Sequence, residues 1–267
     1  MLLLNFGGPR NLDEVPEFLY EILRDPNTIQ LPVPQWAQNL LARRIARRRS
    51  HEVSRQYAAI GGASPIVPAT QAIRNGLLRA LEQAGRPLPV YVAQRYLPGD
   101  AEQAVTALLA DGTDALFVVP LYPHFSYATS GSSFQQVHDL LRAAGWEGPL
   151  RALRSYPDAP GLLEAMGERL ATTLREAGLG PEHTVILCSA HGLPRAYVEQ
   201  GDPYRLELYR TLDALRQQFP GWRFDLSFQS RVGPAEWLKP YTDETIPALA
   251  QQGVHDLVFV PISFVND

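Results

Sequence analysis

The histidine best placed for chemistry is His191, in the segment 189–194 (Ser-Ala-His-Gly-Leu-Pro) directly after the apolar run 185–188. A histidine where a strand leaves the core can accept protons near neutral pH or offer an imidazole nitrogen to a divalent metal. An isolated histidine is more often structural, but the strand-end position favours a functional one. Ser189 lacks the flanking glycines of a GxSxG nucleophile elbow, which argues against an esterase.

Three turn-rich segments deserve comparison, and of these only residues 122–131 leave a strand through both aromatic and hydroxyl side chains. Residues 7–9 (Gly-Gly-Pro) lack the GxGxxG spacing and the lysine of phosphate loops, so they predict a tight turn with close backbone approach. Residues 57–65 form a second glycine-rich turn. Residues 122–131 lead into a helix that we expect to begin at Ser132, with a cap at which an anion could bind.

The other histidines show no metal-ligand spacing, so we interpret them as surface or packing residues. They are His51, His124, His138, His183 and His255.

Short apolar runs alternate with helix-period segments along most of the chain, which predicts an α/β fold with parallel strands. We expect strands at 2–5, 89–94, 115–120, 184–189, 224–229 and 257–262. We expect helices near 68–84, 100–111, 132–144, 160–177, 203–218 and 242–252. Asp100 and Asp202 stand at two helix starts, where a carboxylate can act as a cap.

A weak internal repeat predicts two similar halves, residues 1–150 and 151–267. Gln94 and Arg95 precede a helix and an apolar strand ending in proline, and residues 229–231 (Gln-Ser-Arg) precede the same pattern. After residue 120 the first half continues into another helix and strand, whereas the second half has only six residues after Pro261. Ligands of such sheets bind at the carboxyl ends of the strands, so we expect the strand exits to face one crevice.

Residues 10–65, which we call the lip segment, are an insertion between the first two strands. They combine apolar side chains between positions 18 and 36 with five arginines between positions 43 and 49. One interpretation is a mobile apolar segment next to a cluster of basic residues, suited to a flat apolar ligand that carries carboxylates or to a membrane surface. The alternative, which we favour, is an ordinary amphipathic helix pair with a solvated basic face.

The overall composition excludes several function classes. With 24 basic and 28 acidic residues and a net charge of −4, the chain has no global attraction to nucleic acid or anionic lipid. Cys188 is the single cysteine, so no intrachain disulfide, cysteine zinc cluster or four-cysteine iron–sulfur centre can form within this chain, and we expect a reducing cytoplasm. Residues 1–4 predict a first strand, not a signal peptide, and no apolar stretch approaches transmembrane length.

Taken in order, five segments resemble the ferrochelatase family. They are residues 3–9, Tyr57 with residues 60–65, residues 120–123, residues 189–194, and residues 229–234 with Trp237, Leu238, Pro240 and Thr242. The resemblance implies a chelatase-like α/β fold of two Rossmann-like halves with parallel sheets and a cleft between them, the second half being incomplete. It implies insertion of ferrous iron into protoporphyrin IX or coproporphyrin III to form haem, with no resident cofactor.

The resemblance also implies roles for matching residues. His191 would be the catalytic proton acceptor or metal contact, with Asp267 beside it. The residues implied on the metal side of the porphyrin are Arg95, Tyr96 and Tyr122, and those implied against the macrocycle are Phe6, Trp237 and Phe264. Tyr57 and Ser64 would hold the propionate end, with an arginine from positions 43–49. Ser126 is a further implied contact. The physical requirement is a pocket that bends the ring, exposes nitrogen lone pairs and removes two protons.

The sequence departs from the family pattern at its end. In ferrochelatases the last strand leads to an aspartate, a histidine, one further residue and a glutamate, whereas here Asp267 is the final residue. We therefore expect a truncated chain of low stability that inserts little metal. Alternatives are a chelatase for another metal and tetrapyrrole, a non-catalytic porphyrin or haem binder, and an unrelated α/β binding protein. We expect a monomer or weak dimer in the cytoplasm, with peripheral membrane contact left open.

Overall fold

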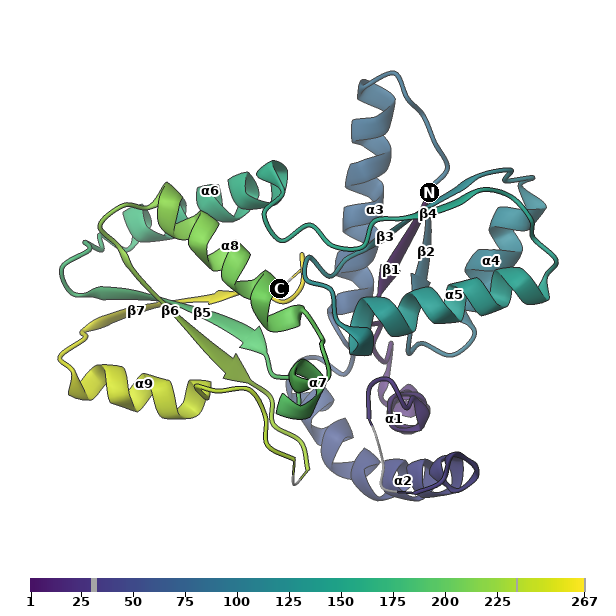
Figure 1. Ribbon diagram of the computed structural model, residues 1–267, viewed down its shortest axis with the longest axis horizontal. Coiled ribbons are helices and arrows are strands. Elements are labelled where there is room, and N and C mark those ends of the chain that lie inside the picture. The colour runs from purple at the N-terminus through teal and green to yellow at the C-terminus, as the bar shows by residue number, and fades with distance from the viewer. Residues whose placement is uncertain (30–32, 234, 267) are drawn as a thin grey trace. The chain divides into compact units, whose positions relative to one another are not determined.

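The computed structural model describes residues 1–29, 33–233 and 235–266 (Figure 1). The chain forms two compact units. Unit 1 comprises residues 1–121 and 127–154 together with Asn266, and unit 2 comprises residues 122–126 and 155–265. The division at residues 150 and 151 proposed from the repeat stays a prediction.

Unit 1 is built on a four-stranded parallel sheet in the order β2-β1-β3-β4. Its strands are β1 (Leu2–Asn5), β2 (Tyr91–Gln94), β3 (Leu116–Pro120) and β4 (Leu150–Ala152). All four residues of β1 are buried, as expected for a central strand with helices on both faces. The lip segment supplies a 3-10 turn at Leu12–Glu14 and the helices α1 (Val15–Arg24) and α2 (Gln35–Ala59).

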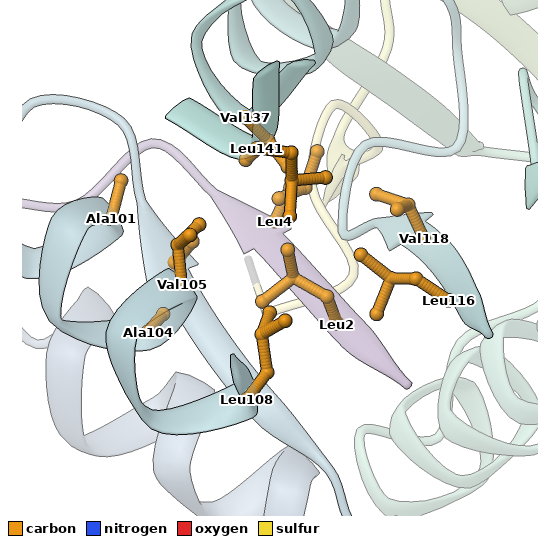
Figure 2. Close-up of a cluster of buried hydrophobic side chains, with 11 residues drawn as sticks. Leu2, Leu4, Ala101, Ala104, Val105, Leu108, Leu116, Val118, Val137 and Leu141 are labelled. Carbon is orange, nitrogen blue, oxygen red and sulfur yellow. The ribbon is translucent and has the colours of Figure 1, made fainter. Parts of the chain in front are cut away.

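The core of unit 1 lies where α4 (Asp100–Ala110) and α5 (Ser132–Ala143) pack on the sheet (Figure 2). Leu2 and Leu4 of β1 meet Val105 and Leu108 of α4, with Val137 of α5 beside them. Val105 and Leu108 lie on one face of α4, three positions apart, and Leu2 and Leu4 lie on the same face of β1, two positions apart, which lets these pairs meet. The helix α3 (Ile66–Gln83) precedes β2 and contacts it.

Unit 2 contains a three-stranded parallel sheet in the order β6-β5-β7. Its strands are β5 (Thr184–His191), β6 (Arg223–Gln229) and β7 (Asp256–Pro261). Its helices are α6 (Pro160–Glu176), α7 (Arg195–Glu199), α8 (Tyr204–Gln218) and α9 (Thr242–Gln251). Figure 1 shows α6 and α8 together on one side of the sheet and α9 on the other. The two parallel sheets confirm the predicted α/β class with two halves, of which the second is smaller.

The six expected strands and six expected helices are confirmed, with bounds that differ by at most two residues. The short helix α7 was missed, and a π-helical turn at Tyr127–Gly131 directly precedes α5. None of the helices in the described ranges is both long and apolar enough to span a bilayer.

Two of the expected caps are wrong. Gly99 is the cap of α4, and Asp100 instead accepts the backbone N–H of Gln94 at 2.8 Å. Ser132 makes no capping bond to α5, because its hydroxyl donates to the Asp25 carboxylate. Asp202 does accept a backbone N–H at the start of α8, that of Tyr204 at 2.9 Å.

Candidate functional site

The two glycine motifs of unit 1 meet at the carboxyl edge of its sheet. Gly7 has a φ of 82°, and a Cβ there would lie only 3.0 Å from the Cβ of Gln94. A Cβ on Gly8 would lie 2.5 Å from the side chain of Ser64. The backbone N–H of Ser64 donates to the Pro9 carbonyl at 2.8 Å. The absence of side chains at residues 7 and 8 therefore brings Ser64 against the end of β1, and the predicted tight turn with close approach is confirmed.

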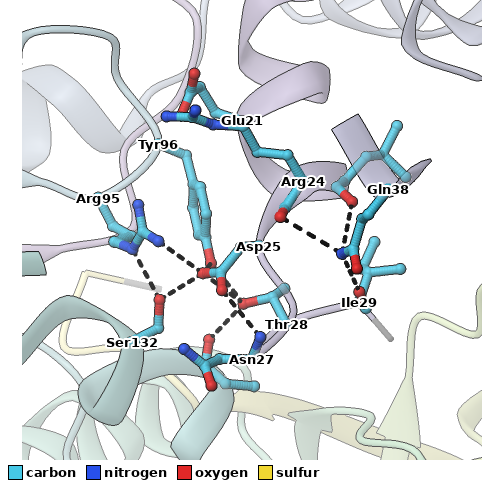
Figure 3. Close-up of polar contacts among 12 residues, drawn as sticks. Glu21, Arg24, Asp25, Asn27, Thr28, Ile29, Gln38, Arg95, Tyr96 and Ser132 are labelled. Atoms are coloured by element: carbon cyan, nitrogen blue, oxygen red, sulfur yellow. Dashed lines mark hydrogen bonds and ion pairs between the residues drawn. The ribbon is translucent and has the colours of Figure 1, made fainter. Parts of the chain in front are cut away.

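Arg95 lies just beyond β2 and is fixed by hydrogen bonds on two sides (Figure 3). Its Nη2 donates to Asp25 Oδ2 at 2.8 Å, and its Nε donates to the Ser132 hydroxyl at 2.7 Å. The Arg95 side chain is 16% exposed, whereas that of Asp25 is 2% exposed. The arginine is thus held at the sheet edge with part of its guanidinium accessible.

Tyr96 is buried, and its hydroxyl donates to Asp25 Oδ2 at 2.7 Å. Burial, followed by the negative charge of Asp25, raises the pKa of Tyr96, so the phenol stays protonated and remains a donor. In this structure its polar end faces the Asp25 carboxylate inside unit 1.

Aromatic contacts join the lip segment to the sheet edge. The Phe6 ring lies 4.5 Å from the Tyr96 ring and 6.3 Å from the Phe18 ring on α1. Phe18 in turn lies 6.5 Å from Tyr57, at the end of α2. Burial raises the pKa of the half-buried Tyr57. Unit 1 therefore brings together Phe6, Tyr57, Ser64, Arg95 and Tyr96, five of the implied substrate contacts.

In unit 2, His191 is the last residue of β5 and the first exposed one after seven buried residues. Its backbone N–H donates to the Ser263 hydroxyl at 2.6 Å, and Tyr204 donates to its carbonyl at 3.0 Å. The ring Nδ1 lies 2.7 Å from the Gly192 carbonyl, which can only accept, so Nδ1 carries the proton and Nε2 keeps its lone pair.

The surroundings of His191 favour the neutral imidazole. Although the residue is exposed, protein atoms crowd its ring and disfavour the charged form, so burial lowers the pKa of His191, against a smaller opposite effect of the bond to Gly192. The ring therefore presents a neutral nitrogen that can accept a proton at neutral pH.

Trp237 lies beside His191, with the two ring centroids 6.4 Å apart. Gly192 makes this possible, because a Cβ there would lie 2.8 Å from the Gln229 carbonyl and 2.9 Å from the indole. The indole N–H donates to the Val232 carbonyl at 3.0 Å. A flat aromatic surface is thus fixed next to the histidine.

The remaining implied residues of unit 2 divide into two groups. The Tyr122 and Phe264 rings contact each other at 5.6 Å, with Tyr122 buried. Ser126 is also buried, and its hydroxyl donates to Asp202 at 2.8 Å. Asp267 lies outside the described residues. These roles stay predictions.

The sequence analysis missed three supporting residues, Asp25, Tyr204 and Ser263, which hold Arg95 and His191 in place. The only signal for Asp25 was its position at the end of a helix before Pro26. In the described part of the chain, no group of three histidine, cysteine, aspartate or glutamate side chains is arranged to hold a metal ion.

Comparison with known proteins accounts for the whole chain. The ferrochelatase family model matches residues 1–267. The chain is 42% identical over 275 residues to the ferrochelatase of Parasynechococcus marenigrum and 41% identical over 280 residues to that of Synechocystis sp., covering all of this chain and 70% of each relative. It is 42% identical to the ferrochelatase of Gloeobacter violaceus, of which it covers 82%. Because the motifs at the strand ends and the full-length match agree, the chain belongs to the ferrochelatase family.

Proposed function

We propose that this chain binds a porphyrin and ferrous iron as substrates and that His191 is the catalytic proton acceptor. In the reaction, a divalent iron replaces two pyrrole N–H protons, so one porphyrin and one Fe²⁺ give one haem and two protons. His191 Nε2 takes up one of these protons, and the second leaves to solvent. The support is the neutral, partly exposed imidazole whose Nδ1 is bound to the Gly192 carbonyl.

The neighbouring residues support this assignment through their chemistry. Trp237, fixed 6.4 Å from the His191 ring, offers an aromatic face to a macrocycle. In unit 1, Tyr57 and Ser64 are hydroxyl donors suited to the propionate end of a porphyrin, and Phe6 is suited to its macrocycle. The guanidinium of Arg95, which the resemblance places on the metal side, is also suited by its charge to a porphyrin carboxylate. Whether the porphyrin is protoporphyrin IX or coproporphyrin III depends on the number of carboxylates to be bound, and both belong in the assay.

A metal-insertion assay on the purified chain tests the proposal. Each porphyrin is offered with Fe²⁺ under anaerobic conditions and with Zn²⁺ as a stable substitute, and porphyrin binding is followed separately by quenching of tryptophan fluorescence. We expect His191→Ala to slow insertion about 100-fold or more, the range for loss of a general base, and to bind porphyrin nearly as well as the wild type. His138→Ala, at an exposed histidine on α5, is the matched control.

The outcomes separate two classes of protein. Equal insertion rates for the wild type and His191→Ala would refute the role of the histidine. Porphyrin binding without insertion of either metal, both by the chain and by a version extended past residue 267, would instead favour the non-catalytic porphyrin binder.

We propose that the protein is a cytoplasmic monomer or weak dimer without a resident cofactor. We also propose that its helix α2 makes peripheral contact with an anionic membrane. Trp36 and Leu40, four residues apart on this helix, are 76% and 70% exposed, and the arginines at positions 43, 44 and 47–49 are exposed as well. Apolar side chains next to basic ones are typical of interfacial helices. We expect co-sedimentation with phosphatidylglycerol vesicles but not with phosphatidylcholine vesicles, and its loss in Trp36→Ser. Equal recovery with both lipids would contradict the membrane proposal.

A further inference from the structure

We propose that Asp25 is a positioning residue for porphyrin binding, which acts by fixing the guanidinium of Arg95 at the edge of the unit 1 sheet. This inference rests on the proposed function, because it assigns to Arg95 a contact with the substrate. The side chain of Asp25 itself is only 2% exposed. Its effect must therefore pass through the groups that it holds.

The Asp25 carboxylate is the centre of a buried hydrogen-bond network (Figure 3). Oδ2 accepts from Arg95 at 2.8 Å, from the Tyr96 hydroxyl at 2.7 Å and from the Ser132 hydroxyl at 2.5 Å. Oδ1 accepts the backbone N–H of Asn27 at 2.9 Å. A carboxylate with this many donors is confined to one orientation, so it is a rigid anchor.

The anchor leaves one edge of the Arg95 guanidinium available. Nη2 is bound to Asp25 and Nε to Ser132, while Nη1 makes no hydrogen bond within the described ranges. The guanidinium carbon also lies 4.8 Å from the centre of the Tyr96 ring, which adds a contact with its face. With two of three nitrogens fixed, the third is directed at a set position, where it can donate to an anionic group of a ligand.

A merely structural role for Asp25 predicts a different set of effects. Asp25 ends α1, and Gln38 on α2 holds the same turn by donating to the Ile29 carbonyl at 3.1 Å. Gln38→Ala would loosen this turn without touching the carboxylate. Gln38→Ala is therefore the matched control. If Asp25 only stabilises the turn, both variants should change porphyrin binding, whereas if Asp25 positions Arg95, only Asp25→Asn should change it.

The first experiment tests the positioning itself and needs no ligand. The Nε–H of Arg95 is observed by ¹⁵N NMR, and its exchange with water is measured in the wild type, Asp25→Asn and Gln38→Ala. We expect a protected signal in the wild type and in Gln38→Ala, and exchange at least tenfold faster in Asp25→Asn. Unchanged protection in Asp25→Asn would overturn the inference, whatever the function of the protein.

The second experiment is a mutant cycle on porphyrin binding, measured by tryptophan quenching at a temperature where every variant is folded. We expect Arg95→Gln and Asp25→Asn each to weaken binding about tenfold, and the double variant to be no weaker than Arg95→Gln alone. Independent, multiplying effects, or a value for Asp25→Asn within twofold of the wild type, would overturn the inference. Should Asp25→Asn not fold, Asp25→Glu takes its place in both experiments with the same criteria.

The two proposals fail in distinguishable ways. If the wild type binds no porphyrin, the proposed function fails, and the NMR measurement still decides whether Asp25 fixes Arg95. If the wild type binds porphyrin and Asp25→Asn binds equally well, only the present inference fails.

Discussion

The stability of unit 2 should depend on pH through His124, which is 1% exposed. Thr211 donates its hydroxyl proton to the Pro157 carbonyl at 2.6 Å, so the His124 Nε2–H must donate to the Thr211 oxygen at 2.7 Å. The other ring nitrogen, Nδ1, has no hydrogen-bond partner among the described residues. Protonation of Nδ1 would place an unpaired charge in the core, so burial lowers the pKa of His124 from 6.5 to about 3.

The sign and size of the effect follow from these two values. As the pH falls below 6.5, the unfolded chain takes up a proton at this histidine and the folded chain does not, so stability is lost, and the loss levels off below about pH 3. Between pH 7 and pH 4, the pH passes through roughly two and a half units below 6.5, and each unit lowers the free energy of unfolding by about 1.4 kcal/mol or slightly less. The free energy of unfolding therefore falls by about 3 kcal/mol. This histidine alone should lower the urea midpoint of unit 2 by about 1–3 M.

Replacing the titrating group isolates its contribution from that of other residues. In His124→Phe the aromatic ring is kept and the proton site is removed, while Thr211 keeps its bond to the Pro157 carbonyl. Urea unfolding at pH 7 and pH 4, followed by tryptophan fluorescence, should show a pH-dependent loss about 3 kcal/mol smaller in His124→Phe than in the wild type. His138→Phe, at an exposed site, should follow the wild type. Parallel losses in the wild type and His124→Phe would refute the reasoning.

Three further predictions concern the end of β5. Ser263→Ala removes the acceptor of the His191 backbone N–H and should lower the free energy of unfolding by about 1–3 kcal/mol in urea titrations; a change below about 0.5 kcal/mol would contradict it. Gly192→Ala places a methyl group 2.8 Å from the Gln229 carbonyl and should destabilise by about 1–3 kcal/mol. Gly161→Ala should not, because among the described residues no atom beyond its chain neighbours and its own helix backbone lies within 4 Å of the new methyl. Because burial lowers the pKa of His191, any rate of metal insertion should keep its pH 7 value as the pH falls and decline only below the ordinary histidine value of 6.5; a decline above pH 6.5 would contradict this.

Local patterns were sufficient to predict the strands and most helices. The runs at 2–4 and 185–188 are apolar throughout, which is typical of central parallel strands, and both runs are indeed buried. His191 was found for the same reason, since the end of a strand is visible where an apolar run stops. The sequence alone was therefore sufficient to identify the candidate residues nearest the strand ends.

Contacts between distant residues were not predictable in this way. Asp25 and Arg95 are 70 positions apart, and nothing in the composition of either segment pairs them. The wrong cap at Ser132 has the same origin, because the side chain bonds to the carboxylate of Asp25, 107 positions away. At Asp100 the competing partner is nearer, the backbone N–H of Gln94 six positions before it, which binds the carboxylate in place of a helix N–H.

The internal repeat allows equivalent positions in the two sheets to be compared. In unit 1 the end of β1 pairs with β2 so that Asn5 is opposite Gln94, and in unit 2 the end of β5 pairs with β6 so that His191 is opposite Gln229. His191 therefore occupies in its sheet the position of Asn5. In both sheets a glycine shortly after this position packs closely against the paired glutamine.

The two equivalent positions differ in burial. Asn5 is fully buried and its amide donates to Thr70 at 2.8 Å, so this position in unit 1 serves packing. His191 is exposed and its Nδ1–H is fixed by the Gly192 carbonyl, so the same position in unit 2 presents the Nε2 lone pair that the proposed proton transfer requires. One strand-helix-strand plan thus places a buried amide at the end of the strand in one sheet and an exposed imidazole at the equivalent position in the other.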